Sequence, residues 1–134
     1  LYFSSNRDGS WDVYRVRQDG TGWSAPQKLP EGINTAADEW PGSVEAEGRF
    51  LLFSSIRAGG AGADDIYIAC ASGDGWRAPV MLGDSINTAA FEDTPLITPD
   101  GRYLLFGRHG GGHPAGPAGA LHRRSADVVN RACD

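Results

Sequence analysis

The sequence predicts an all-β fold that is built from repeated units. One pattern runs twice through the first hundred residues, with LYFSSNR (1–7) returning as LLFSSIR (51–57) and GWSAP (22–26) returning as GWRAP (75–79). The segment INTAA stands at 33–37 and again 53 residues later, at 86–90. A near-fixed period of about 50 residues is typical of a modular array.

Each unit is expected to contain four short antiparallel strands. In the central unit these are 40–44, 50–55, 65–71 and 76–82, separated by Gly-containing turns such as AEGR (46–49) and SGDG (72–75). No segment keeps a helical period over about ten residues, so no helix is expected. Four strands in a unit of this length are the pattern of one β-propeller blade.

The whole chain is therefore expected to form a single propeller segment of about 2.5 blades. Residues 1–37 would be a partial blade, 38–90 a complete blade, and 91–134 a partial blade with an irregular tail, whose third strand would lie near 120–129. Such a segment cannot close a ring. The remaining blades are expected to come from a longer chain, or alternatively from homo-oligomerisation.

Composition excludes several classes of partner. The 134 residues are 40% hydrophobic with 19 glycines, which fits a folded protein of short strands and tight turns. The formal net charge is −5 and no Lys/Arg run is present, so neither nucleic acid nor an anionic membrane is expected as a partner. No apolar run reaches the roughly 20 residues that span a bilayer, and no membrane insertion is expected.

The repeated blocks also carry a family resemblance. PDGRYLLF (99–106) and LLFSSIRAGGAGADDIY (51–67) resemble the TolB-type β-propeller repeats of bacterial periplasmic proteins. The resemblance covers residues 1–108, whereas EAEGR (45–49) lacks the Pro-Asp of the family turn and the tail departs altogether. It implies a periplasmic or secreted location, although no signal peptide is visible in the chain.

Binding is expected on the face that carries the longer, more polar loops, because loops on a rigid scaffold commonly carry function. The strand order brings the loops 30–41, 83–95, 6–11, 57–64 and 108–119 to this face. Its candidate binding residues are Arg7, Trp11, Asn34, Glu39, Trp40, Arg57, Asn87, Glu92, Arg108, His109 and His113.

Two carboxylate–guanidinium pairs recur among these candidates. Glu39 falls opposite Arg57 across a hairpin, and Glu92 falls opposite Arg108 in the next unit. They would form either a ring of charges that binds a polar ligand or repeated salt bridges that hold each blade. Their recurrence favours the structural interpretation and argues against a catalytic site.

The recurring amides and strand-start acids are also expected to be structural. Asn34 and Asn87 would hold turns through bonds to the backbone. Asp12 and Asp65 would begin strands rather than act as bases.

The tryptophans divide into two kinds. Trp23 and Trp76 recur and are expected to pack in the core. Trp11 and Trp40 do not recur and stand beside the loop face, so they are better candidates for contact with a ligand.

Metal and cofactor sites are not expected. His109 and His113 flank a glycine run, but nothing in the sequence supplies the further ligands of a metal site. Cys70 is interpreted as a buried small apolar residue, with a disulfide to Cys133 as the alternative.

These observations predict a non-catalytic binding or scaffold module that engages a protein, peptide or glycan through its loop face. The alternative is the propeller domain of a larger hydrolase or of a sugar-cleaving enzyme. A peptidase would need a G-x-S-x-G segment elsewhere. A sugar-cleaving propeller would need histidine and acidic side chains that converge at the channel mouth.

Overall fold

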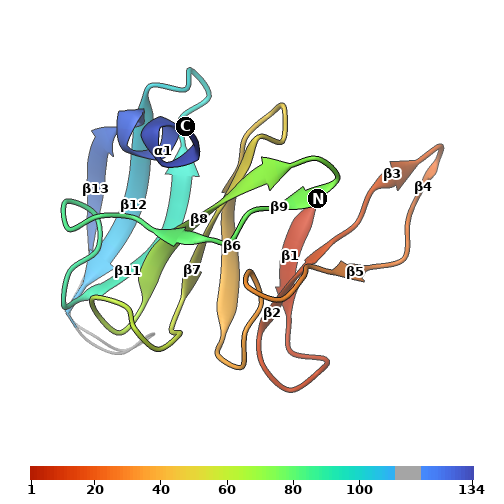
Figure 1. The fold of residues 1–134 in the computed structure, drawn as a ribbon, viewed down its shortest axis with the longest axis horizontal. Coiled ribbons are helices and arrows are strands. Elements are labelled where there is room, and N and C mark those ends of the chain that lie inside the picture. Colours follow the sequence, from red (N-terminus) through yellow and green to blue (C-terminus); the bar gives the residue numbers. More distant parts are fainter. Residues whose placement is uncertain (111–118) are drawn as a thin grey trace.

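Three antiparallel sheets follow one another along the chain in the computed structural model, which describes residues 1–110 and 119–134 (Figure 1). The first sheet contains β1 (Tyr2–Ser5), β2 (Asp12–Arg15) and β5 (Gln27–Lys28). The second contains β6 (Glu39–Val44), β7 (Phe50–Ser55), β8 (Asp65–Ser72), β9 (Gly75–Trp76) and β10 (Val80–Met81). The third contains β11 (Phe91–Ile97), β12 (Tyr103–His109) and β13 (Ala120–Ser125).

The predicted all-β class is confirmed, and among the described residues the sheets form no closed ring (Figure 1). The second sheet keeps the strands in chain order, β6-β7-β8-β10, with β9 paired to β8. The expected continuous strand 76–82 is instead broken into short pieces, and so is the equivalent segment 23–29 of the preceding unit. Pro26 and Pro79 lie at the breaks, where a residue without an N–H cannot donate to a ladder.

The core lies between the sheets, and β7 shows why. All six of its residues are buried, because neighbouring sheets cover both of its faces. Side chains alternate along a strand. Leu51 and Phe53 therefore pack with Val13 of the first sheet, while Leu52 packs in the opposite cluster with Phe106 of the third.

The expectation that the chain contains no helix is wrong. The helix α1 (Asp127–Cys133) follows β13 directly, so the expected strand 120–129 ends at Ser125. Val129 of the helix is fully buried against the cluster between the second and third sheets. Seven residues are too few to reveal a helical period in the sequence. In the described part of the chain, no helix has the length and apolarity of a membrane span.

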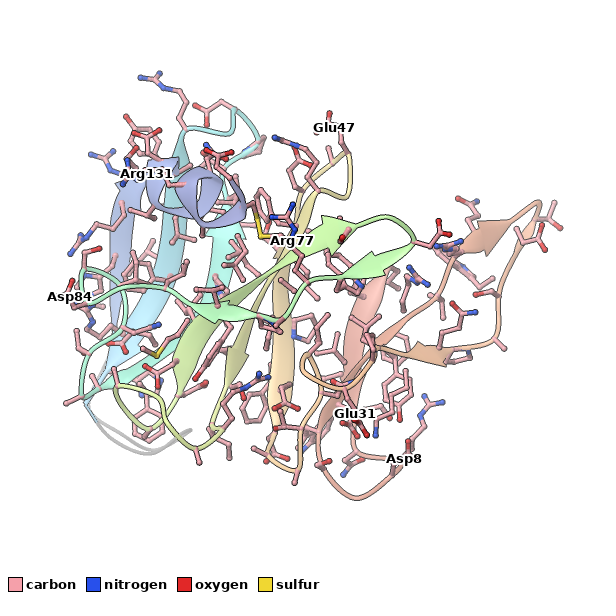
Figure 2. The ribbon with its side chains drawn as sticks, in the orientation of Figure 1. Asp8, Glu31, Glu47, Arg77, Asp84 and Arg131 are labelled. Atoms are coloured by element: carbon pink, nitrogen blue, oxygen red, sulfur yellow. A yellow bond between two sulfur atoms is a disulfide. The ribbon has the colours of Figure 1, made fainter. Side chains whose placement is uncertain are left out.

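The interpretation of Cys70 as an unbonded apolar residue is also wrong. Cys70 of β8 forms a disulfide with Cys133 at the end of α1, with the two Cα atoms 5.5 Å apart. The bond is visible beside α1 in Figure 2. The partners lie 63 residues apart in sequence, and only the folding of the tail onto β8 brings them together.

The two recurrent tryptophans do not share one environment. Trp76 is partly buried and packs against the cluster between the first and second sheets. Trp23 is 61% exposed, and its predicted core position is wrong. It lies on the hairpin of β3 (Gln18–Asp19) and β4 (Gly22–Trp23), which projects away from the three sheets (Figure 1).

We expect loss of the disulfide to destabilise the chain because the bond closes a long loop in the unfolded state. Replacing Cys70 and Cys133 with Ser should lower the free energy of unfolding by roughly 2–4 kcal/mol. Thermal melting with and without a thiol reductant measures this. The reductant should lower the melting temperature of the wild type and leave the double variant unchanged; an unaffected wild type would contradict the role given to the bond.

Candidate functional site

The recurring asparagines hold the loops that precede the second and third sheets. Asn34 Oδ1 accepts the Val13 N–H at 2.7 Å, and its amide donates to the Val13 carbonyl at 3.0 Å. Asn87 makes the same pair of bonds to Ile66, at 2.8 and 2.9 Å. Both asparagines are buried. Each side-chain amide therefore bonds to the neighbouring strand as a backbone peptide group would, and it fixes its loop to that sheet.

Glu39 is the centre of a buried clamp. Its carboxylate accepts the Thr35 N–H at 3.0 Å and the Thr35 hydroxyl at 2.6 Å. It also accepts the Ser55 hydroxyl at 2.9 Å and Nη2 of Arg57 at 3.3 Å. Glu39 is fully buried, so this set of donors compensates the removal of its charge from water.

Glu92 repeats the clamp with one change of register. Thr88 again donates its N–H and its hydroxyl, at 2.9 and 2.6 Å. Arg108 lies directly opposite Glu92 across the strand pair, whereas Ser55 lies opposite Glu39. The Nε of Arg108 donates to the Glu92 carboxylate at 2.7 Å. Each clamp arginine also donates at 2.6 Å to the isoleucine carbonyl of the preceding INTAA segment. The two pairs are thus built into the scaffold.

Arg7 lies apart from these clamps. Its guanidinium is stacked 4.6 Å from the ring centre of Tyr14, as Arg57 is stacked 4.6 Å from that of Tyr67. Its Nε donates to the Ser5 hydroxyl at 3.1 Å. Arg7 therefore packs on the first sheet.

A cavity of about 630 Å³ opens at the end of the sheets where β6 and β11 begin and β7 ends. The loop between β1 and β2 and the loop between β7 and β8 lie at this end, at the bottom of Figure 1. Residues from three successive repeats line it: Trp11, Trp40, Pro41, Ser54, Ile56, Asp64, Phe91, Asp93 and Thr94. The structure thus brings Trp11 and Trp40 together, whereas Asn34, Glu39, Arg57, Asn87, Glu92 and Arg108 support the fold around them.

The cavity lies where the repeat changes. Three pairs of lining residues are 53 positions apart and differ in chemistry: Trp11 and Asp64, Trp40 and Asp93, Pro41 and Thr94. The residues beside them, such as Glu39 and Glu92, are identical. In each pair the earlier residue is aromatic or apolar, and the residue one period later is acidic or polar.

Asp64 was not among the sequence candidates, and it is the least satisfied of the lining groups. It is 6% exposed, and its Oδ1 has no hydrogen-bond partner among the described residues. Burial raises the pKa of Asp64 to about 7, and the neighbouring carboxylates of Asp93 and Asp65 add to the rise, while His109 opposes it. Functional sites commonly retain groups perturbed in this way.

The second acidic residue of the lining, Asp93, pairs with His109. Asp93 Oδ2 lies 3.0 Å from Nε2 of His109, and the His109 ring stacks on Phe91 with ring centres 5.1 Å apart. A side chain at Gly107 would collide with Asp93 Oδ1, so the glycine makes room for this carboxylate. The only hint in the sequence was that aspartate replaces Trp40 one period later.

The backbone at Thr94 is strained. Its φ of 48° lies in the left-handed region, within a β-bulge between Asp93 and Leu96. Such backbone is uncommon for a β-branched residue and is found preferentially at functional sites. The bulge lies at the cavity, and Thr94 is one of the residues that line it.

The described residues contain no cluster of three or more His, Cys, Asp or Glu side chains that could hold a metal ion. His113 lies in 111–118, outside the described residues.

No family model matches the chain, and no curated protein matches it significantly. The geometry described above is therefore the basis for a functional proposal.

We expect Glu39→Gln to destabilise the fold, because Arg57 and the Thr35 N–H would lose a charged acceptor. The free energy of unfolding should fall by roughly 2–4 kcal/mol, as for other broken buried pairs. Chemical denaturation measures it, with Glu47→Gln in the exposed turn after β6 as the control. Equal stability of Glu39→Gln and the wild type would show that the clamp is not structural.

Asp64→Asn should stabilise the chain in a pH-dependent way. The folded pKa of about 7 lies above the unfolded value near 3.8, so the native state binds the extra proton and loses stability as the pH rises between these values. Asparagine does not titrate. The variant should gain roughly 2–4 kcal/mol over the wild type near pH 8 and little near pH 4.

Melting curves at both pH values check this prediction. An advantage that is equal at both would mean that the Asp64 carboxyl is not ionised at a cost to stability in the folded chain.

Proposed function

We propose that the chain is a segment of a TolB-like β-propeller and serves as a binding module for a protein, peptide or glycan. Its three sheets would be successive blades, with boundaries at 1–37, 38–90 and 91–134. Support comes from the strand order of the second sheet and from the clamps of Glu39 and Glu92, which recur at one period. Further blades would come from a longer chain or from other copies.

A periplasmic or secreted location belongs to the same proposal. It follows from the family resemblance and is supported by the disulfide between Cys70 and Cys133, since such bonds persist mainly in oxidising compartments.

The observation that carries the proposed function is the cavity at the point where the repeat changes. Scaffold residues such as Asn34 and Asn87 repeat in identity and in hydrogen bonding. The lining residues Trp40 and Asp93 occupy equivalent positions but differ in chemistry. Scaffold requirements alone would give similar residues at both positions, so the difference is best explained by contact with a ligand.

One observation favours a second candidate, cleavage of a sugar. Asp64 and Asp93 line the same cavity, and His109 is hydrogen-bonded to Asp93. Because its pKa is about 7, Asp64 is partly protonated near neutral pH, as a general acid must be. This grouping of a histidine with acidic side chains supports the candidate.

Arrays of synthetic peptides and of glycans, probed with the 134-residue chain, test the binding proposal. Probes that bind the wild type should bind Trp11→Ala and Trp40→Ala at least roughly tenfold more weakly. Trp23→Ala is the matched control, because Trp23 is exposed on β4 and does not line the cavity.

Two results would overturn the proposal: the absence of any bound probe, or binding that is unchanged in both cavity variants. Release of shortened sugars from the glycan probes, abolished by Asp64→Asn, would instead support the sugar-cleaving candidate.

A further inference from the structure

We infer that the cavity binds an organic cation on an apolar stem, presented by a peptide as a lysine or arginine side chain. This inference rests on the proposed binding function and specifies the ligand of the same cavity. Three features of the described residues support it: the charge of the lining, the unpaired oxygen of Asp64, and the aromatic residues of the lining.

The described residues that line the cavity include two aspartates and no lysine or arginine. Asp64 and Asp93 are the charged residues among those that line the cavity, and His109 beside them bonds to Asp93. The nearby guanidinium of Arg108 is held by Glu92 and by a backbone carbonyl. A positive group entering the cavity would therefore meet complementary charge, whereas an anionic ligand would be repelled.

A cation would supply both the hydrogen-bond donor and the compensating charge that the Asp64 carboxylate lacks. Its buried Oδ1 lacks a donor among the described residues, and an unsatisfied buried acceptor is costly. A glycan hydroxyl could donate a hydrogen bond, but it would leave the repulsion between the carboxylates of Asp64 and Asp93 in place. An ammonium or guanidinium group offers both the N–H and the compensating charge.

The aromatic residues of the lining suit the stem of such a side chain. Trp11, Trp40 and Phe91 contribute aromatic surface that can pack on methylene groups and face a cation. The chain already uses this contact internally, since Arg57 lies 4.6 Å from the ring centre of Tyr67. A volume of about 630 Å³ accommodates a long side chain together with adjoining peptide backbone.

Binding of the cation should depend on pH, because it depends on the ionisation of Asp64. The titratable groups around Asp64 are the adjacent Asp65 at the start of β8, Asp93 of β11 and His109 of β12. A cation prefers Asp64 ionised, and its pKa of about 7 means that ionisation is completed as the pH rises past neutral. Affinity for the cationic peptides should therefore increase from about pH 6 to about pH 8.

A series of capped pentapeptides of sequence Gly-Ala-Xaa-Ala-Gly tests the inference. Xaa is Lys, Arg, acetyl-lysine or citrulline, so that each cation has a neutral counterpart with a similar stem and no terminal charge contributes. Calorimetric titration of the wild type should show the Lys and Arg peptides binding at least roughly tenfold more tightly than their neutral counterparts.

Matched variants locate the effect. Asp64→Asn should remove the preference for the cation, with Asp93→Asn as a second variant on β11 that reduces it. Trp40→Ala should weaken binding of every peptide in the series. Glu47→Gln removes one exposed carboxylate at the end of the molecule opposite Asp8 and Glu31, and should change nothing (Figure 2).

The outcomes separate this inference from the function on which it rests. Equal affinity for charged and neutral peptides, or Trp40-dependent binding of glycans without binding of the Lys and Arg peptides, would overturn the cation inference and leave the binding module intact. Cation binding that is unaffected by both Asp64→Asn and Trp40→Ala would reflect the net negative surface and would overturn the inference. Failure of every peptide and glycan probe to bind would overturn both.

Discussion

The buried carboxylate of Glu39, and its counterpart Glu92, is the interaction on which the arrangement depends. Each carboxylate joins the loop before its sheet to the first strand and to the second strand, which Glu39 reaches through Ser55 and Glu92 reaches through Arg108. A carboxylate that is fully buried is tolerated only while all of these donors are in place, so the clamp allows little variation. It thereby also fixes the residue that follows it, which is Trp40 in one sheet and Asp93 in the next.

This arrangement separates what stabilises the chain from what is available to a ligand. Among the polar groups that repeat, Asn34 and Asn87 make equivalent bonds to neighbouring strands, and Asp12 and Asp65 each retain one buried oxygen without a partner among the described residues. Asp64 also retains such an oxygen, and it differs from these groups because it lines the cavity and replaces the Trp11 of the preceding unit. A buried carboxylate with a raised pKa lowers stability, and such a cost is expected where function requires the group.

The tail stabilises the end of the molecule that lies away from the cavity. Val129 of α1 fills the cluster between the second and third sheets, and Cys133 binds β8 through the disulfide. The contact of α1 with β8 thus joins the last segment of the chain to the middle sheet.

The sequence by itself determined the elements whose signals are local or periodic. The 53-residue repeat and apolar runs such as FLLFSS (50–55) located the main strands, and the spacing of Glu39 and Arg57 predicted their pairing across a hairpin. Tertiary structure alone decided what depends on distant contacts. The bond from Cys70 to Cys133 spans 63 residues, and α1 is too short to show a period. Asp64 meets Phe91 and Asp93 only because separate repeats converge at one end. Trp23 is exposed because none of the three described sheets covers its hairpin, whereas Trp76 is partly buried. The similar sequences around the two tryptophans do not reveal this difference.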